Sequence, residues 1–213
     1  MFLDKCDQSG SETLWFWESP RVFVVIGYGQ RADREVEEEN CAIDGIPILR
    51  RCSGGGAVVQ GPGCLNYGLA LRIDQRTEID SITKANRWIM NHNALALERL
   101  LEDSVAVAGH TDLVVQGRKV SGNAQRRRSR TLLFHGTFLC GLHFPWVDRY
   151  LKTPSLMPEY RRGRMHSEFI GNLEVGASQV MGALREIWGV GRDQEALAVD
   201  ECYKKLNHRR LHE

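Results

Sequence analysis

Residues 50–58 (RRCSGGGAV) combine positive charge with three successive glycines, which suits the binding of an anion or a carbonyl oxygen. The glycines Gly54, Gly55 and Gly56 follow a predicted strand, and glycine backbones can approach a ligand closely. Their N–H groups can converge on one oxygen atom, while Arg50 and Arg51 add planar donors of fixed charge. The alternative interpretation is a flexible glycine hairpin beside two solvated arginines.

Two further segments carry candidate chemistry. In residues 117–124 (GRKVSGNA), Lys119 follows a glycine turn at the start of a predicted strand, so its ammonium group can point into a pocket. The alternative is a basic hairpin tip that faces water. In the triplet His135-Gly136-Thr137 the glycine interrupts an apolar strand, which indicates close approach by another chain segment or a ligand. His135 fits either a binding role or a buried, hydrogen-bonded position.

Residues 27–32 (GYGQRA) follow a predicted strand and fit the G-x-G-x-x-A pattern of a dinucleotide-binding turn. The acidic residue expected about twenty positions later is missing, and arginines lie there instead. The surrounding strand–helix–strand unit is also poor. We therefore interpret this turn as unrelated to dinucleotide binding.

The elements that must position these segments form an irregular mixture of strands and helices. Strands are predicted over residues 21–26, 47–51, 67–73, 112–115, 119–128 and 131–142. Helices are predicted over residues 80–101, around Val180 and Leu184, and over 193–207, whereas residues 143–175 look irregular. Because no regular strand–helix alternation is present, the fold class is α+β. We expect a catalytic-type domain over residues 1–175 and a C-terminal helical appendage over residues 176–213.

The composition of the chain limits the classes of partner that it is expected to bind. A net charge of +1 over 213 residues argues against broad binding of nucleic acid or anionic membrane, and no apolar run reaches membrane-spanning length. The basic run over residues 126–130 then fits an acidic protein partner. Without a signal-like N-terminus, a cytoplasmic location is expected. The six cysteines are scattered without C-x-x-C spacing, so they indicate neither zinc nor a disulfide framework.

In this order and spacing the three segments resemble the lipoate-protein ligase A family. Residues 50–58 resemble its lipoate-binding loop, residues 112–124 (DLVVQGRKVSGNA) its catalytic stretch, and residues 135–137 its HGT-type triplet. A weaker likeness extends over residues 160–173. The resemblance implies a biotin/lipoate ligase-like catalytic domain, with a central mixed β-sheet flanked by helices. It also implies a short form without the C-terminal accessory domain, which in some members is supplied by a separate accessory subunit.

The resemblance further implies a reaction and its residues. Lipoate and ATP with Mg²⁺ would give lipoyl-AMP, and the lipoyl group would pass to a lysine of a lipoyl domain of a 2-oxoacid dehydrogenase subunit or of the glycine-cleavage H protein. Lys119 would be catalytic and Asp112 a Mg²⁺ ligand. The substrate-binding residues would be Arg50, Arg51, Ser53, Gly54, Gly55, Gly56, Ala57, His135, Gly136 and Thr137. The nucleotide-binding residues would be Asn66, Lys119, Gly122, Asn123 and Ala124. Gln60 departs from the family, which often has histidine there.

Two other functions stay open. Octanoyltransferases of this superfamily use a cysteine nucleophile, placed either shortly before the Gly-Arg-Lys turn or well after the HGT-like strand. Neither residues 105–112 nor residues 146–201 contain cysteine, and Cys140 matches neither position, which favours the ligase. A non-catalytic binding protein on the same fold is the other alternative, although Lys119 and the intact glycine triplet argue against it.

Overall fold

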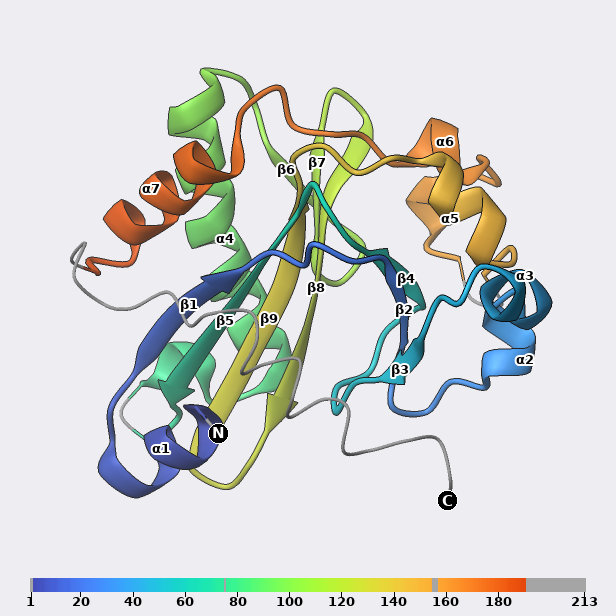
Figure 1. Ribbon diagram of the computed structural model, residues 1–213. Coiled ribbons are helices and arrows are strands. Elements are labelled where there is room, and N and C mark those ends of the chain that lie inside the picture. Colours follow the sequence, from blue (N-terminus) through green and yellow to red (C-terminus); the bar gives the residue numbers. More distant parts are fainter. Residues whose placement is uncertain (1, 75, 155–156, 191–213) are drawn as a thin grey trace.

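The computed structural model describes residues 2–74, 76–154 and 157–190, which build two β-sheets of unequal size with helices around them (Figure 1). The large sheet has the strand order β1-β5-β9-β8-β7-β6. Its strands are β1 (Thr13–Trp17), β5 (Cys64–Arg72), β6 (Ala106–Ala108), β7 (Asp112–Val115), β8 (Arg118–Arg127) and β9 (Thr131–Leu139). The small sheet, in the order β3-β2-β4, consists of β2 (Phe23–Ile26), β3 (Ile48–Arg50) and β4 (Val58–Gln60).

The α+β class is confirmed, but the prediction of a mixed central sheet needs correction. Every neighbouring pair in the large sheet is antiparallel. Strands β6 to β9 follow one another through short connections, and such connections return the chain in the opposite direction. Mixed pairing occurs in the small sheet, where β2 pairs parallel with β3 and antiparallel with β4.

The helices fall into three groups. Helices α4 (Ile82–Leu101) and α7 (Ala177–Ile187) pack against each other, and α1 (Phe2–Ser9) contacts β5 and β9. Four short helices gather around the small sheet in Figure 1. These are α2 (Ala32–Glu35), α3 (Glu38–Ile43), α5 (Pro145–Tyr150) and α6 (His166–Phe169). Single 3₁₀ turns occur at η1 (Thr77–Ile79) and η2 (Glu159–Arg161).

The main core lies on the face of the large sheet that α4 and α7 cover. Along β5, Leu65, Tyr67, Leu69 and Leu71 alternate onto this face, as the two-residue period of a strand requires. The intervening residues point to the other face. That second face is covered by α1 at one end, where Cys6 and Trp15 form a small cluster with Ala70, and by the small sheet at the other.

Helix α7 belongs to this main core. Val180 and Leu184 are fully buried in the same cluster as residues of α4 and of the large sheet. The predicted boundary at residue 175 therefore falls before a helix that packs as part of the catalytic-type domain, because its apolar stripe completes the core. The predicted helix over residues 193–207 lies outside the described residues.

Most long elements were correctly predicted, and the missed ones are short. The helix over residues 80–101 is observed as α4, and each of the six predicted strands overlaps an observed one. Three strands, β1, β4 and β6, were not predicted, and neither was α1. The segment from 143 to 175, predicted to be irregular, contains α5, η2 and α6. No helix within the described residues is both long and apolar enough to span a membrane.

The packing of Trp15 against β5 gives a stability prediction. A Cβ at Gly68 would lie 2.2 Å from the Trp15 ring, so Gly68→Ala should lower the free energy of unfolding by about 1–3 kcal/mol through overpacking. In the exposed middle of α7, a Cβ at Gly182 meets nothing within 4 Å. Gly182→Ala should raise the free energy of unfolding by about 0.5–1 kcal/mol through helix propensity. Urea denaturation measures both changes, and an unaffected Gly68→Ala protein would contradict the packing argument.

Candidate functional site

A row of paired residues crosses the second face of the large sheet. Asp112 pairs with Gly122, Gly122 with Thr137, and Thr137 with Asn66, across β7, β8, β9 and β5. Directly opposed residues in an antiparallel pair point to the same side of a sheet. These four residues, which the sequence separates by up to 71 positions, therefore share one face.

Lys119 joins this face because of a β-bulge. Ser121 pairs with Leu113 and Lys119 with Val114, so Val120 is an extra residue on β8. A bulge changes which side of the sheet the following side chains occupy. Val114 lies two residues from Asp112 and on the same side, so Lys119 is placed there as well.

The ammonium group of Lys119 is held beside Asp112. Lys119 Nζ lies 2.8 Å from Asp112 Oδ1, and 26% of the lysine side chain is exposed. A Cβ at Gly122 would come within 2.9 Å of Lys119 Cε and 3.0 Å of its Nζ. The absence of a side chain at Gly122 therefore lets the lysine lie across β8, and the basic hairpin tip facing water is not what the structure shows.

Tyr160 completes this corner, and sequence reasoning missed it. Its hydroxyl donates to Asp112 Oδ2 at 2.5 Å. Burial and the neighbouring Asp112 carboxylate raise the pKa of Tyr160, which keeps the hydroxyl protonated as a donor. The only signal was the weak resemblance over residues 160–173, because nothing in the local pattern shows that η2 folds back onto β7.

Asp112 therefore has two protein partners, Lys119 and Tyr160. Among the described residues no group of three or more His, Cys, Asp or Glu side chains could hold a metal ion. Mg²⁺ generally takes one or two carboxylates plus phosphate oxygens and waters. A single carboxylate is compatible with a Mg²⁺ ion that arrives with phosphate oxygens, but both oxygens of Asp112 are bonded to Lys119 and Tyr160 here, so Mg²⁺ binding by Asp112 stays a prediction.

Both arginines of residues 50–58 bind carbonyl groups of nearby loops. The Arg51 guanidinium donates to Gly54 O at 2.8 Å and to Gly56 O at 2.7 Å. Burial lowers the pKa of Arg51 to about 10, so it stays charged at neutral pH. Arg50 Nη1 donates to the carbonyl oxygens of Gly27, Tyr28 and Gln30. Arg50 is exposed and Arg51 half-buried, but both guanidinium groups are bound to loop carbonyl oxygens, so the loop is not a free hairpin.

The turn at Gly27, which imitates a dinucleotide-binding motif, supports the glycine loop. Tyr28 N donates to Ser53 O at 2.8 Å, and Gln30 Oε1 accepts from Gly27 N at 2.8 Å. A Cβ at Gly27 would lie 2.2 Å from Gly55 O. Glycine is thus required at position 27 because the backbone of one loop touches the backbone of the other.

Ser53 connects the glycine loop to the large sheet. Its Oγ lies 2.6 Å from Nε2 of His135, which is paired with Ala124 on the same face as Thr137. Burial, and secondarily the charge of Arg51, lowers the pKa of His135 to about 4. His135 is therefore neutral at pH 7 and acts as a hydrogen-bonding group.

A second buried connection runs from β4 to β5. Gln60 Nε2 donates to Thr137 Oγ1 at 2.8 Å, Thr137 Oγ1 donates to Asn66 Oδ1 at 2.7 Å, and Asn66 Nδ2 donates to Cys64 O. Gln60 Oε1 is buried without a hydrogen-bond partner among the described residues. Asn66 thus lies on the same face as Lys119, with its amide engaged within the protein.

Two predicted site residues lie on the opposite face. Asn123 and Gly136 pair with each other and belong to the side facing α4, where Tyr67 Oη donates to Asn123 Oδ1 at 2.7 Å. A Cβ at Gly136 would lie 1.8 Å from Asn123 Oδ1. The predicted nucleotide contact of the Asn123 side chain is therefore not supported, and Gly136 is explained by the protein side chain that passes over it.

The structure thus brings most predicted residues to one region between the two sheets. One row across the sheet face contains Asp112, Gly122, Thr137 and Asn66, and Lys119 lies beside Asp112. His135 and Ala124 pair with each other two residues further along their strands, and they point to the same face. Ser53 of the glycine loop contacts His135 there. Gly54, Gly55 and Gly56 are exposed, and Ala57 is half-buried against the small-sheet core.

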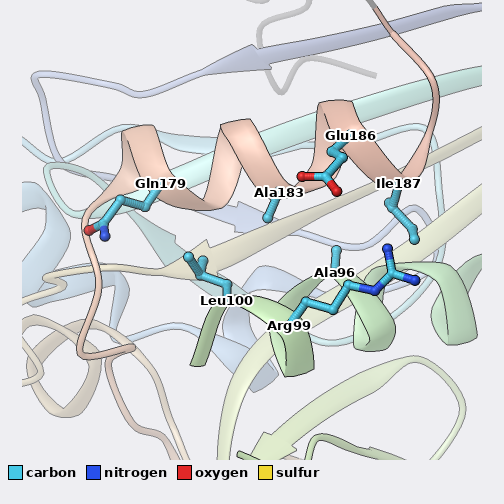
Figure 2. A pocket seen from close by; sticks show the side chains of 7 residues that line it. All are labelled: Ala96, Arg99, Leu100, Gln179, Ala183, Glu186 and Ile187. Carbon is cyan, nitrogen blue, oxygen red and sulfur yellow. The ribbon is translucent and has the colours of Figure 1, made fainter. Parts of the chain in front are cut away.

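A separate cleft of about 200 Å³ lies between α4 and α7 (Figure 2), on the core side of the large sheet. It is lined by Ala96, Arg99, Leu100, Gln179, Ala183, Glu186 and Ile187. These side chains include no nucleophile and no cluster of titratable groups. This cleft therefore contains none of the predicted site residues.

Comparisons with known proteins show the family and the fold of the chain. A family model described as the lipoyl protein ligase A/B catalytic domain matches residues 1–178. Lipoate-protein ligase LplJ of Bacillus subtilis (strain 168) is 32% identical over 116 residues, which are 54% of this chain and 33% of the relative. Lipoate-protein ligase A subunit 1 of Thermoplasma acidophilum is 27% identical over 170 residues, 76% of this chain and 65% of the relative.

Another relative has a different activity. The octanoyltransferase LipM of Carboxydothermus hydrogenoformans is 30% identical over 171 residues, 71% of this chain and 62% of the relative. The chain thus spans between one third and about two thirds of these three relatives. Sequence identity near 30% does not separate ligase from transferase.

Solved structures show the same fold. A bipartite lipoate protein ligase from Thermoplasma acidophilum, described with its E2 lipoyl domain, superposes with a TM-score of 0.74 at 23% identity, over 97% of this chain and 84% of that chain. A lipoate-protein ligase A bound with ATP gives 0.75 at 22% identity, over 97% and 85%. The predicted lipoate ligase-like catalytic fold is confirmed.

The neutral state of His135 predicts a pH-dependent stability. Its folded-state pKa of about 4 lies below its ordinary value of 6.5, so the unfolded chain takes up the proton first as the pH falls. The stability present at pH 7 is then lost progressively between pH 6.5 and pH 4. When the pH is lowered from 7 to 5, the free energy of unfolding should fall by about 2 kcal/mol less in His135→Gln than in the wild type.

Urea denaturation at the two pH values measures this difference. Ser53→Ala is the matched control, because it removes the hydrogen bond and keeps the titrating imidazole. Equal losses in the wild type and His135→Gln would show that His135 titrates normally in the folded protein.

Proposed function

Because the chain belongs to the lipoyl protein ligase A/B catalytic domain family, we propose that it is a lipoate-protein ligase. It would activate lipoate with ATP and transfer the lipoyl group to a lysine of a carrier protein. The observation that carries this proposal is the placement of Lys119, whose ammonium lies beside Asp112 on the sheet face that also binds the glycine loop through Ser53 and His135.

The chemistry explains the need for a fixed positive charge. In the first step a lipoate carboxylate oxygen attacks the α-phosphorus of ATP, and pyrophosphate leaves. In the second step the acceptor amine attacks the acyl carbon, AMP leaves, and the amine loses a proton. Two anions approach in the first step, and negative charge develops on the acyl oxygen in the second. A preorganised ammonium would stabilise the charge in both steps, and the position of Lys119 beside Asp112 supports this role.

The remaining residues would bind different parts of the two substrates. The exposed glycine triplet offers backbone N–H groups to the acyl carbonyl end, and Ala57 borders the small-sheet core beside it. Gly122 and Ala124 leave room above β8 where a nucleotide would lie against the backbone. Asp112 would hold Mg²⁺ once phosphate oxygens complete its coordination.

An octanoyltransferase is the second candidate, because one relative has that activity. Such a reaction needs a cysteine thiolate. Burial raises the pKa of Cys64 to about 12 and that of Cys140 to about 11, which makes both poor nucleophiles at neutral pH. Cys52 is exposed next to Ser53 in the glycine loop and is the accessible candidate among the described cysteines.

The acceptor and the accessory partner follow from the relatives. One related structure is described with an E2 lipoyl domain, and one relative is named as the first subunit of a ligase. We therefore propose that the acceptor is a lipoyl domain of a 2-oxoacid dehydrogenase subunit or the glycine-cleavage H protein. A separate accessory subunit would assist adenylation.

The ligase proposal is tested by the mass of an apo lipoyl domain incubated with the chain, lipoate, ATP and Mg²⁺. A gain of one lipoyl group is expected. Preformed lipoyl-adenylate replaces lipoate and ATP in a parallel reaction, which detects transfer when adenylation requires a partner. A gain with octanoyl carrier protein alone would indicate the transferase, and no gain in any reaction would leave a binding protein.

Variants at Lys119 and Gly122 test the placement of the ammonium group. Lys119→Ala should slow transfer by at least about 100-fold, the usual effect of removing one charge-stabilising donor. Gly122→Ala should slow it by about 10–100-fold, because the added methyl displaces Nζ from its position. Gly182→Ala on α7 is the glycine control and should keep the wild-type rate. Normal turnover by Lys119→Ala would remove Lys119 from the mechanism.

The two enzymatic activities differ in their dependence on Cys52. Cys52→Ser should retain full ligase activity, because no thioester is needed when ATP supplies the leaving group. Intact-mass analysis of the wild type with acyl donor should show no acyl adduct. Loss of activity together with an acyl-thioester on Cys52 would establish the transferase instead.

A further inference from the structure

We propose that Asn123 is a positioning residue, which holds Asp112, and through it Lys119, from the core face of the large sheet. The importance of this role for catalysis rests on the proposed function, whereas the structural constraint itself does not. The starting observation is that the Asn123 side chain points away from Lys119 and yet ends beside the backbone that carries Asp112.

The Asn123 side chain occupies a space that the residue paired with it leaves open. A Cβ at the paired position, Gly136, would lie 1.8 Å from Asn123 Oδ1 and 2.6 Å from Asn123 Cγ. Only glycine leaves this space open. The side chain therefore lies flat against the neighbouring strand rather than being free to rotate.

In this position Asn123 bonds to Thr111, and the two residues extend the pairing of β8 with β7 beyond the end of β7. The paired residues of β7 begin at Asp112, so Thr111 lies outside the ladder. Asn123 Nδ2 donates to Thr111 O at 2.8 Å, and Thr111 Oγ1 donates back to Asn123 O at 2.6 Å. Two bonds through side chains thus replace the missing backbone pair, and Thr111 is buried at 9% exposure.

The anchored residue directly precedes the site. Asp112 follows Thr111 in the chain, and its carboxylate contacts Lys119 Nζ and Tyr160 Oη. On the other side of Thr111 the chain turns through Gly109, which has a φ of +56°. Asp112 is the last paired residue at this end of β7, opposite Gly122 on β8 and Ala108 on β6. Without the two bonds, only these end pairs would hold the Asp112 backbone against the turn over residues 109–111, and the carboxylate that orients Lys119 would be less firmly positioned.

The Asn123 amide oxygen is also held, by a chain of hydrogen bonds that reaches the core helices. Asn123 Oδ1 accepts from Tyr67 Oη, Tyr67 Oη accepts from Asn93 Nδ2 at 2.8 Å, and Asn93 Oδ1 accepts from Trp188 Nε1 at 3.0 Å. Asn93 is on α4, and Trp188 lies directly after α7. Burial raises the pKa of Tyr67 and keeps its hydroxyl a donor. The orientation of the Asn123 amide is therefore determined by the core helices.

The first test measures the constraint without any substrate, by amide hydrogen exchange over residues 108–112. Asn123→Ala and Thr111→Val, the second nearly isosteric with threonine, should both speed exchange there by at least about tenfold, because local opening becomes easier. Thr111→Ser keeps the hydroxyl and should exchange like the wild type. Gln125→Ala is the matched control, since Gln125 lies two residues along the same strand and face and bonds to Asn86 on α4. Wild-type exchange in both Asn123→Ala and Thr111→Val would overturn the proposal.

The second test asks whether the constraint acts through Asp112. In the transfer assay, Asn123→Ala and Thr111→Val should lower kcat by about tenfold with an unchanged KM for lipoate, while Thr111→Ser and Gln125→Ala stay near the wild type. In an Asp112→Asn background, Asn123→Ala should bring no further loss of kcat. A multiplied loss would show that Asn123 acts independently of Asp112. Should the wild type lack transfer activity, the exchange result still decides the proposal, because it needs no substrate.

Discussion

The site depends on one extra residue in β8. Side chains of a strand alternate between two faces, so Lys119, three positions from Gly122, would point into the core of a regular strand. The bulge at Val120 reverses this parity and places the ammonium on the face of Asp112. In the core an ammonium group without a carboxylate would be strongly unfavourable. The bulge thus separates a charged face from an apolar one within a single strand.

The same strands therefore serve two purposes. On one face, Tyr67, Phe134 and Phe138 build the main core with α4 and α7. On the other face, small or polar residues such as Gly122, Ala124 and Thr137 leave space beside Lys119, and the glycine loop is bound to the same face through Ser53 and His135. Asn123 connects the core to the strand end that carries Asp112, because its side chain accepts from Tyr67 and donates to the backbone of Thr111.

The resemblance to the ligase family predicted which segments come together, namely residues 50–58, 112–124 and 135–137, whereas each segment alone also fitted an ordinary turn or strand. The patterns did not predict the direction of each side chain. Asn123 was assigned to the nucleotide, yet its face is set by the register of β8 against β9, which local composition does not encode. Tyr160 was missed because its approach to Asp112 depends on how residues 143–175 fold back.

The short elements were missed for a related reason. Strands β4 and β6 contain three residues each, too few to display an alternation. The five residues of β1 (TLWFW) are apolar almost throughout, because Leu14 and Phe16 enter the main core while Trp15 packs over Gly68. The turn at Gly27 imitates a nucleotide motif because both uses require a glycine where two backbones, or a backbone and a phosphate, approach closely.

The hydrogen bonds of Arg50 and Arg51 have an electrostatic consequence. Within the described residues, every hydrogen bond of the two guanidinium groups goes to a neutral carbonyl oxygen and none to a carboxylate. Carbonyl oxygens orient a guanidinium without cancelling its charge. The mouth of the glycine loop therefore carries an uncompensated positive field in a protein of near-zero net charge. Such a field attracts small carboxylates and phosphates from a distance and weakens as the ionic strength rises.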